Sequence, residues 1–350
     1  MGRRIAVIPG DGIGIEVVTE AVRVLEKANR LYHLDLEFTW FDWGAEKYLR
    51  EGVTLPSGAV EMLQSDYAAI LAGAFGDPRV PDNKHAHDIL LGLRFRLDLY
   101  INLRPVRLLA EDLTPLKNRT VRDLDFVIFR ENTEGAYVGI GGIFKKGTDE
   151  EIALQEEINT RRGVERIIVA AFEYARRQGR RRVTLVDKSN AMRFGHDLWQ
   201  RTFREVAHRY PEIEATHQYV DTMALLMVQN PAECDVIVTT NLFGDILSDL
   251  GAALVGGLGV APSGNIHPGR VSLFEPVHGS APSLAGKNLA NPIGAVLTAA
   301  MMLEYLDEKP AARAIETAVI ETIAAGEVTR DLGGRLSTSE AGQAIVARLR

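Results

Sequence analysis

The chain has 350 residues, 46% of them hydrophobic and 25% charged, which is the balance of an ordinary globular enzyme with material for a sizeable core. This length exceeds one typical domain, so two lobes are expected. The 40 basic and 47 acidic side chains give a formal net charge of −7, which argues against a dedicated nucleic-acid-binding protein, since such proteins need a basic face.

A single cysteine, Cys234, excludes an intrachain disulfide and fits a reducing cytoplasm. It lies at the entry to an apolar strand-like run, where a structural role is expected rather than a nucleophilic one. Met1–Arg4 leads directly into a strand-like run, so neither a signal peptide nor a membrane span is expected.

Short β-branched runs alternate with amphipathic stretches along the chain. The runs predict strands at Ile5–Ile8, Tyr67–Leu71, Phe126–Phe129, Arg182–Val186 and Val236–Thr240. The stretches predict helices at Gly14–Ala28, Arg162–Arg177, His196–Arg209 and Asn291–Leu306. This alternation predicts an α/β fold with mostly parallel pairing at its centre. No Ser/Gly linker separates two halves, so the lobes are expected to share the chain discontinuously.

Three further segments have simpler expectations. The opening Pro9–Gly14 has the spacing G-x-G-x-G, which is not the Rossmann fingerprint. Lys84–Asp88 holds two close histidines whose spacing suits neither a helix face nor a zinc site, so a solvated loop is expected. The polar stretch Gly141–Glu157 predicts either a projecting arm or hairpin, or a plain surface loop.

Arginine side chains stand out in two neighbouring segments. Arg94, Arg104 and Arg130 would provide three guanidinium forks, each able to grip a carboxylate through two hydrogen bonds. The alternative is three surface arginines with ordinary ion-pair partners. Because Arg104 and Arg130 flank apolar strand-like runs, inward placement is favoured for these two.

The segment Thr239–Asp249 is predicted to start as a strand, turn through Asn-Leu-Phe-Gly and become helical. Asp245 and Asp249 are four residues apart and would share one helix face. Their mutual repulsion and oxygen ligands suit Mg²⁺ or Mn²⁺. The alternative is one aspartate favoured by the helix dipole and one solvated aspartate.

A third segment, Leu273–Pro282, is bounded by proline and glycine and carries Glu275, His278 and Ser280. Such a segment is typical of a ligand-binding loop. His278 taken alone fits a hydrogen-bonded structural histidine better than a catalyst.

Taken together and in order, these segments resemble the β-decarboxylating dehydrogenases, the family of isopropylmalate, isocitrate, homoisocitrate and tartrate/D-malate dehydrogenases. The motifs that carry the resemblance are IAVIPGDGIG from Ile5, NLRPVR from Asn102, FRENTEGAY from Phe129, VDKSN from Val186, TTNLFGDILSDL from Thr239, VAPSGNI from Val260, LFEPVHGSAP from Leu273 and MMLEYL from Met301.

The resemblance implies a two-lobed, non-Rossmann α/β fold with a discontinuous large lobe. The large, cofactor-binding lobe would comprise 1–99 and 252–350, and the small lobe 100–251 would carry the dimer interface and metal residues. It implies an obligate homodimer with shared active sites, in which Asp221 and Lys188 reach across from the partner subunit. Asp221 would join Asp245 and Asp249 as metal ligands and would also contact the substrate.

The resemblance also assigns the remaining roles. The metal, Mg²⁺ or Mn²⁺, would chelate the 2-hydroxyl and its carboxylate, lowering the hydroxyl pKa and stabilising the enolate left by decarboxylation. Lys188 would help remove the hydroxyl proton as hydride passes to the nicotinamide, and Tyr137 would protonate the enol. The NAD site would be lined by Glu275, His278, Gly279, Ser280, Ala281, Ser283 and Asn291.

Two positions depart from the family pattern. Ile15 replaces a common proline at a helix start. Ser283 stands where NAD-linked members commonly carry an aspartate for the ribose 2′-hydroxyl, so NAD is expected with weaker discrimination against NADP.

Leu90 and Leu91 precede Arg94 in the segment that reads the third substituent of the substrate. Their apolar wall fits a branched alkyl group and would strand a third carboxylate. A Leu-Leu pair also occurs in tartrate/D-malate enzymes, so the wall does not separate these two substrates. VDKSN from Val186 and VDTMA from Val220 resemble isopropylmalate dehydrogenases more closely. We therefore expect 3-isopropylmalate, an intermediate of leucine biosynthesis, with tartrate or D-malate as the alternative. A catalytically silent regulatory subunit is disfavoured, because Tyr137, Lys188 and the three aspartates are retained.

Overall fold

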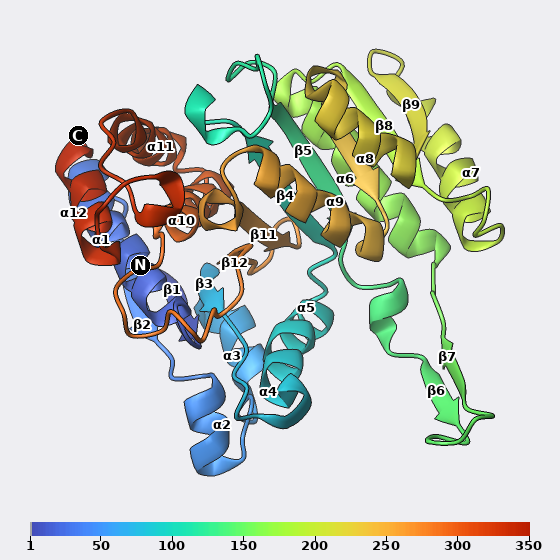
Figure 1. The fold of residues 1–350 in the computed structure, drawn as a ribbon, viewed down its shortest axis with the longest axis horizontal. Coiled ribbons are helices and arrows are strands. Elements are labelled where there is room, and N and C mark those ends of the chain that lie inside the picture. The colour runs from blue at the N-terminus through green and yellow to red at the C-terminus, as the bar shows by residue number, and fades with distance from the viewer. Residues whose placement is uncertain (1) are drawn as a thin grey trace.

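The computed structural model describes residues 2–350, and its main feature is a ten-stranded sheet with helices on both faces (Figure 1). The strand order is β2-β1-β3-β12-β11-β4-β5-β10-β8-β9. The strands are β1 (Arg3–Gly10), β2 (Leu36–Trp40), β3 (Ala69–Ala74), β4 (Ile101–Arg107), β5 (Asp125–Glu131), β8 (Arg182–Asp187), β9 (Glu214–Tyr219), β10 (Val236–Thr239), β11 (Pro262–Ile266) and β12 (Leu273–Pro276). Within residues 2–350, no helix has the length and apolar character to span a membrane.

The α/β class is confirmed, but the expected parallel centre is wrong. The central pairs β12–β11, β11–β4 and β4–β5 are antiparallel, while the pairs on either side of them are parallel. The reason is connectivity. A parallel pair needs a crossover connection, usually a helix, whereas β11 reaches β12 through 267–272 without one.

The two ends of the chain build one half of the sheet, and the middle of the chain builds the other. In Figure 1 the blue and red segments lie together, and the green and yellow segments form the opposite half. The first half carries helices α1 (Gly14–Tyr32), α2 (Ala45–Glu51), α3 (Ala59–Asp66), α4 (Lys84–Ala86), α5 (Gly92–Arg96), α10 (Ile293–Tyr305), α11 (Lys309–Ala324) and α12 (Thr338–Arg348). The second carries α6 (Arg161–Gln178), α7 (Gly195–Ala207), α8 (Val220–Gln229) and α9 (Asn241–Leu254).

Strand alternation explains how the sheet acquires a core on each face. In β1, Ile5 and Val7 pack into the cluster under α1, while Ala6 and Ile8 point into the cluster on the opposite face. Helix α1 buries Val17, Val18 and other apolar residues at helical spacing against this sheet. Every predicted strand and helix is present, with ends that differ by a few residues.

The polar stretch Gly141–Glu157 was expected to form either a projecting arm or hairpin, or a plain surface loop. It forms a hairpin. Strands β6 (Gly141–Phe144) and β7 (Ile152–Gln155) pair in an antiparallel two-stranded sheet that projects from the body of the molecule (Figure 1). Ile143, Phe144 and Leu154 on this hairpin are all more than half exposed.

Candidate active site

The three predicted arginines lie at the middle of the sheet and are buried. Arg104 projects from β4, Arg130 from the adjoining strand β5, and Arg94 from the short helix α5. Their exposures are 7%, 1% and 6%, so they are not surface arginines. Buried guanidinium groups require anionic or polar partners. The structure supplies such partners from α9, from β12 and from neighbouring amides.

Helix α9 presents Asp245 and Asp249 to this cluster. The predicted shared face is confirmed, but the helix already begins at Asn241, so the expected Asn-Leu-Phe-Gly turn belongs to its first helical turn. The Asn241 side chain explains this early start, because its Oδ1 accepts hydrogen bonds from Nε and Nη2 of Arg130 at 3.0 and 2.8 Å. The guanidinium of Arg130 therefore holds the first turn of α9 against β5.

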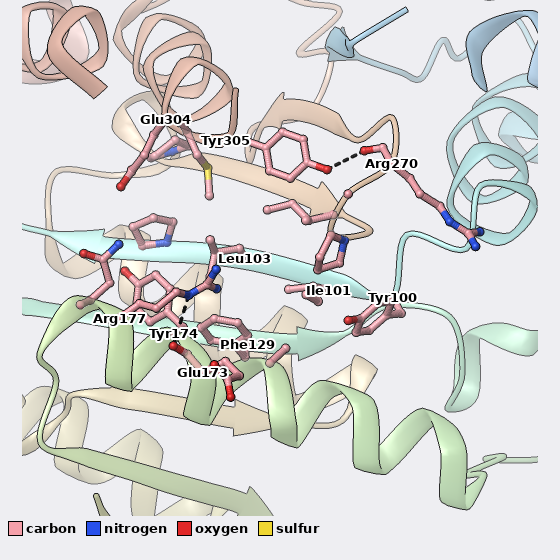
Figure 2. Close-up of a pocket in the computed structure, with 18 of the residues that line it drawn as sticks. Tyr100, Ile101, Leu103, Phe129, Glu173, Tyr174, Arg177, Arg270, Glu304 and Tyr305 are labelled. Atoms are coloured by element: carbon pink, nitrogen blue, oxygen red, sulfur yellow. Dashed lines mark hydrogen bonds between the residues drawn. The ribbon is translucent and has the colours of Figure 1, made fainter. Parts of the chain in front are cut away.

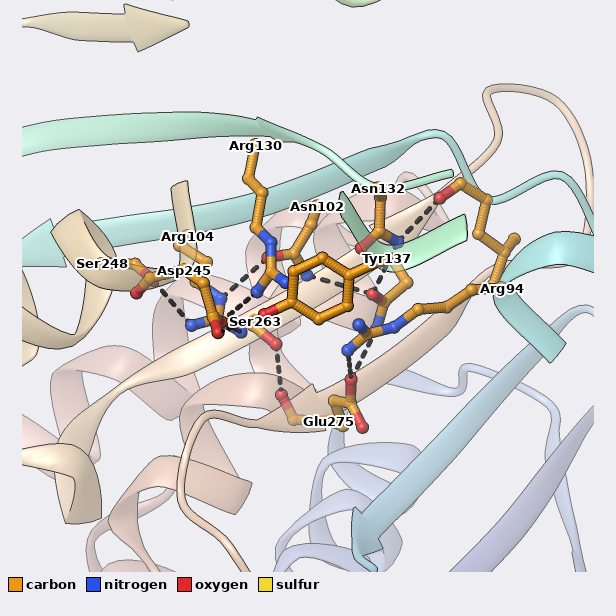
Figure 3. A network of polar contacts seen from close by, with 12 residues as sticks. Arg94, Asn102, Arg104, Arg130, Asn132, Tyr137, Asp245, Ser248, Ser263 and Glu275 are labelled. Carbon is orange, nitrogen blue, oxygen red and sulfur yellow. Dashed lines mark hydrogen bonds and ion pairs between the residues drawn. The ribbon is translucent and has the colours of Figure 1, made fainter. Parts of the chain in front are cut away.

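Asp245 is the most heavily engaged carboxylate of the cluster. It pairs with Arg130, lies 3.7 Å from Nη2 of Arg104, and accepts a 2.8 Å hydrogen bond from the Tyr137 hydroxyl. Asp249 is contacted by Nη1 of Arg104 at 3.3 Å, and its side chain remains 57% exposed. Figure 3 shows Tyr137 lying across the arginine cluster beside Asp245.

The pKa shifts show that positive charge dominates the buried part of this cluster. Burial raises the pKa of Asp245, but Arg130, Tyr137 and Arg104 outweigh it and leave that pKa below its usual value. Burial, Arg104 and Arg94 together lower the pKa of Arg130 to about 10, despite its pairing with Asp245. The pair stabilises the charged form of Asp245, but the neighbouring arginines still destabilise the charged form of Arg130. The cluster therefore favours the binding of further anionic groups.

The pKa values of Tyr137 and Asp249 are raised, in contrast to those of Asp245 and Arg130. Burial, assisted by Asp245, raises the pKa of the Tyr137 phenol above its ordinary value although Arg130 opposes this. The phenol therefore carries its proton at neutral pH. Burial and the neighbouring Asp245 raise the pKa of Asp249 against the opposing effect of Arg104. A cation beside both carboxylates would relieve this repulsion.

A chain of buried amides, which the sequence analysis did not single out, links the arginines (Figure 3). Asn265 of β11 accepts hydrogen bonds from Asn102 at 3.0 Å and from Asn132 at 2.9 Å, and donates to Glu275 at 2.9 Å. Asn102 accepts from Nε of Arg104 at 2.8 Å, and Glu275 accepts from Arg94 at 2.9 Å. In the sequence, this network is indicated by polar asparagines that occur inside strand-like motifs.

Lys188 and Asp221 form a separate pair. Lys188 follows β8 and Asp221 lies in the first turn of α8, with Nζ and Oδ1 2.5 Å apart. The Lys188 ammonium lowers the pKa of Asp221. Among residues 2–350, no hydrogen bond or ion pair connects this pair to the arginine cluster. The single chain therefore brings Tyr137, Asp245 and Asp249 together and leaves Lys188 with Asp221 elsewhere.

The proposed nucleotide residues lie in and around the loop after β12. Ser280 accepts a 2.9 Å hydrogen bond from the backbone N–H of Ile13 through its carbonyl, and the Gly286 N–H donates to Glu16 at 2.5 Å. A cavity of about 440 Å³ lies between this loop and the glycine-rich opening. This volume is within the range of ordinary ligand sites.

The side chains of this loop differ in exposure and in whether they already have hydrogen-bond partners within the protein. Ser283 is exposed, and Ala281 has a positive φ of 37°. His278 is buried with no partner for Nε2, and Gly279 has open space where a side chain would project. Asn291 is engaged within the protein, where its side chain donates to Asp331 at 2.9 Å and accepts from the Ile293 N–H at 3.0 Å.

The expected solvated loop at Lys84–Asp88 is wrong. The segment is helical, and His85 is fully buried with Nε2 2.7 Å from Oδ2 of Asp11. Asp11 also accepts the backbone N–H groups of Ala45 and Gly76 at 2.6 and 2.8 Å. His85 thus fixes the glycine-rich opening. Its partner lies 74 residues away, so no local spacing could reveal the contact.

Leu90 and Leu91 follow in a short π-helical turn, His87–Leu91, immediately before α5. Both are half-buried, and neither belongs to the packed clusters of buried side chains. They stand three or four residues before Arg94 on the same helical run. This spacing places an apolar surface beside a guanidinium group.

The acidic residues on α9 fit part of a divalent-metal site. Two carboxylates with oxygen donors share one face, and Asp249 retains an exposed side chain. Within residues 2–350, no group of three His, Cys, Asp or Glu side chains is arranged to hold an ion.

Comparison with known proteins agrees with this geometry. Residues 4–345 match the family model described as isocitrate/isopropylmalate dehydrogenase. A 3-isopropylmalate dehydrogenase from Thermobifida fusca is 44% identical over 348 residues, covering 99% of this chain and 97% of its own. A tartrate dehydrogenase/decarboxylase from Pseudomonas putida is 46% identical over 352 residues, covering 98% and 96%.

A solved structure extends the likeness to the fold. The crystal structure of isocitrate dehydrogenase from Methylococcus capsulatus superimposes with a TM-score of 0.89 at 39% identity and covers 99% of both chains. Sequence motifs, sheet topology and the buried arginine cluster thus lead to one conclusion. The chain belongs to the isocitrate/isopropylmalate dehydrogenase family.

Proposed function

We propose that this protein catalyses the NAD-dependent oxidative decarboxylation of 3-isopropylmalate. The observation that carries the proposal is the buried cluster of Arg94, Arg104 and Arg130 beside two carboxylates on one face of α9. Buried guanidinium forks recognise carboxylates, and paired aspartates suit a hard divalent cation. Relatives named 3-isopropylmalate dehydrogenase, such as the one from Thermobifida fusca, support this reading over nearly their whole length.

The residues of the chain divide the chemistry between them. Arg94, Arg104 and Arg130 would bind the substrate carboxylates, and Lys188 would accept the proton of the 2-hydroxyl. Tyr137, whose raised pKa keeps it protonated, would return a proton to carbon after carbon dioxide has left. A divalent cation held by Asp245, Asp249 and Asp221, when bound, would polarise the hydroxyl and stabilise negative charge.

NAD is the proposed hydride acceptor, in a site formed by Glu275 and the loop 278–283 with Asn291 nearby. The partnerless Nε2 of His278 and the open space at Gly279 are compatible with a bound ligand. The 440 Å³ cavity between Pro282, Ala285 and Gly286 and the glycine-rich opening adjoins this loop and would admit part of a dinucleotide. Residues 1–99 and 252–350 would form the cofactor-binding lobe, with 100–251 as the second lobe.

We further propose a homodimer in which Lys188 and Asp221 act in the site of the partner subunit. The pair is separate from the arginine cluster of its own chain, and the Asp221 side chain is 66% exposed. Exposed apolar side chains lie on α8, on α9 and on the hairpin: Leu225, Val228, Leu242, Ile246, Ile143, Phe144, Ile152 and Leu154. Such a surface is suited to a symmetric contact between two copies.

The cytoplasm is the proposed location, in keeping with a chain whose one cysteine is a buried free thiol. Cys234 is 7% exposed, and burial and the nearby Glu233 raise its pKa to about 12. A thiol with so high a pKa is inert, which agrees with a structural role. Cys234 lies at the entry to β10, packed with Met223.

A substrate panel tests the proposed reaction. Turnover should be measured with 3-isopropylmalate, D-malate, tartrate, isocitrate and homoisocitrate, each with NAD and NADP. Burying the alkyl branch against Leu90 and Leu91 should contribute roughly 1.5–3 kcal/mol, so kcat/KM for 3-isopropylmalate should exceed that for D-malate by at least about tenfold. Equal or better efficiency with D-malate or tartrate would move the assignment to the activity of the Pseudomonas putida relative.

A further inference from the structure

A second large concavity lies on the face of the sheet opposite the candidate active site (Figure 2). We call it the rear groove. Its floor is formed by Ile101, Leu103 and Phe129, and its walls by α6 on one side and by α10 with Tyr305 on the other. The groove has a volume of about 2020 Å³. None of its lining residues belongs to the hairpin, α8 or α9, so the surface assigned to the dimer leaves it free.

Strand alternation connects the floor of the rear groove to the active site. Along β4, Ile101 and Leu103 line the groove, whereas the intervening Asn102 and the following Arg104 join the polar network on the other face. On β5, Phe129 lines the groove and Arg130 binds Asp245. An occupant of the groove would therefore touch the reverse side of the strands that position the substrate arginines.

The lining is basic although the protein as a whole is acidic. Eight Arg and Lys side chains line the groove against five Asp and Glu, an excess of three positive charges in a chain of net charge −7. Four of these arginines have no ion-pair partner within residues 2–350: Arg162, Arg177, Arg270 and Arg313. Unpaired arginines above an apolar, tyrosine-lined floor are typical of an interface for an anionic partner.

The size of the groove decides between a small molecule and a polypeptide. Arg162 and Arg177 both line it from α6 and lie fifteen residues apart, so they are separated by about 22 Å along the helix axis. The groove volume is also about twice the upper end of the usual range for small-molecule sites. A ligand the size of a metabolite would leave one end of the groove empty.

We propose that the rear groove docks an acidic segment of a partner polypeptide. Apolar side chains of the segment would pack on Leu103 and Phe129, and its carboxylates would pair with Arg162 at one end and Arg177 at the other. About 15 residues in a helix, or six or seven in an extended strand, would span this distance. This role is separate from catalysis and holds whatever substrate the active site takes.

The test uses the intact wild-type protein and a phage-displayed library of random peptides of about 15 residues. The library is first depleted on a charge-reversed variant, Arg162→Glu with Arg177→Glu, and then selected on wild type. Enriched peptides should be acidic with regularly spaced apolar residues. Fluorescence anisotropy of the synthetic peptides should show binding at least about tenfold weaker to the variant, and weaker binding to wild type in high salt.

A matched variant separates the groove from general electrostatics. Lys117→Glu with Arg122→Glu makes the same change in charge at two exposed positions outside the groove, and it should bind the peptides as wild type does. Val169→Glu, which places a carboxylate on the groove wall, should abolish binding while thermal melting confirms the fold. Failure to enrich acidic sequences, or equal loss in the matched variant, would overturn the proposal. So would saturable binding of 1-anilinonaphthalene-8-sulfonate without peptide enrichment, which indicates a small-molecule site.

Discussion

Asn265 fixes three polar side chains relative to one another through a single amide. Its Oδ1 accepts from Asn102 and Asn132, and its Nδ2 donates to Glu275. Because Asn102 orients Arg104 and Glu275 orients Arg94, this amide joins the proposed substrate arginines to the proposed nucleotide site. All of these groups are buried, so each lost hydrogen bond leaves a desolvated polar atom.

Asn265→Asp is expected to break this link with little change in shape. The substitution replaces the donor facing Glu275 with a carboxylate oxygen about 2.9 Å from another, while keeping the acceptor for Asn102. Repulsion should displace Glu275 and Arg94 and lower kcat/KM by at least about tenfold, about 1.4 kcal/mol. Steady-state kinetics should be compared with Asn118→Asp, an exposed control. Unchanged kinetics in a folded Asn265→Asp enzyme would refute the role of the link.

Ser283 is the residue expected to set the preference between NAD and NADP. The serine is exposed and can hydrogen-bond a ribose 2′-hydroxyl, but it lacks the charge that repels a 2′-phosphate. Leu284 beside it does not supply a cation to bind that phosphate, and Lys287 lies three residues further along. NAD should therefore be preferred modestly, and Ser283→Asp should depress NADP use while sparing NAD use. The ratio of kcat/KM for the two cofactors measures this, and a parent ratio favouring NADP contradicts it.

At the scale of elements, helix α9 unites two functions. In its first turn, Asn241 accepts a hydrogen bond from Arg130. The following turns carry Asp245 and Asp249 on the same face. Burial and the repulsion from Asp245 raise the pKa of Asp249, so Arg104 does not fully neutralise this carboxylate. A divalent cation would stabilise both charges at once.

Removal of metal should therefore abolish activity. Exhaustive dialysis against EDTA should eliminate turnover, and added Mg²⁺ or Mn²⁺ should restore it, whereas Na⁺ at equal ionic strength should not. Asp249→Asn removes one of the two charges on the α9 face and should weaken metal binding. The variant should therefore need a higher metal concentration for half-maximal activity. Full turnover by metal-free protein is the result that would disprove a metal role.

The elements show which parts of the fold are readable from sequence. Strands such as β8 and β10 are buried β-branched runs and were predicted close to their observed ends. Strand β11, with sequence Pro-Ser-Gly-Asn-Ile, carries almost no strand signal and forms because β4 and β12 pair on either side of it. Pro105 of β4 is tolerated in mid-sheet because it lies beyond the last residue pair that joins β4 to β11.

The same distinction applies to the site. Arg104, Arg130 and the Asp245–Asp249 spacing could be predicted because each depends on a local pattern. The bond of Asn265 to Asn102 joins residues 163 positions apart, and His85 meets Asp11 across 74 positions. Such contacts follow from how distant strands, helices and loops pack together, which no local pattern contains.

At the scale of the whole molecule, the sheet joins two halves whose boundary passes through the site. Strands β4 and β5 carry Arg104 and Arg130, and the adjacent β11 and β12, from the other half, carry Asn265 and Glu275. The buried amide chain crosses this boundary. Lys188 and Asp221 lie toward the outer strands of one half, and within residues 2–350 the ion pair of each is with the other. In the proposed shared-site arrangement, a complete catalytic set would require a second copy of the chain.

Subunit mixing tests this requirement directly. Lys188→Ala and Tyr137→Phe should each be inactive as homodimers. In a heterodimer, one site would combine an intact Tyr137 with an intact Lys188 from the other chain, and the second site would lack both. Random pairing of equal amounts should then restore about a quarter of wild-type activity, since half the dimers are mixed and each has one working site.

The assay requires unfolding and refolding the two variants together, with separately refolded samples mixed afterwards as the control. Native mass spectrometry should quantify the heterodimer, so that activity can be expressed per mixed dimer. Mixing Lys188→Ala with Asp221→Asn gives a sharper comparison. Both residues would come from the same partner chain, so each of these mixed dimers, unlike the first kind, would hold two defective sites and should stay inactive. If verified Lys188→Ala/Tyr137→Phe heterodimers show no activity, each chain must assemble Lys188 and Tyr137 within itself, and the shared-site arrangement is wrong.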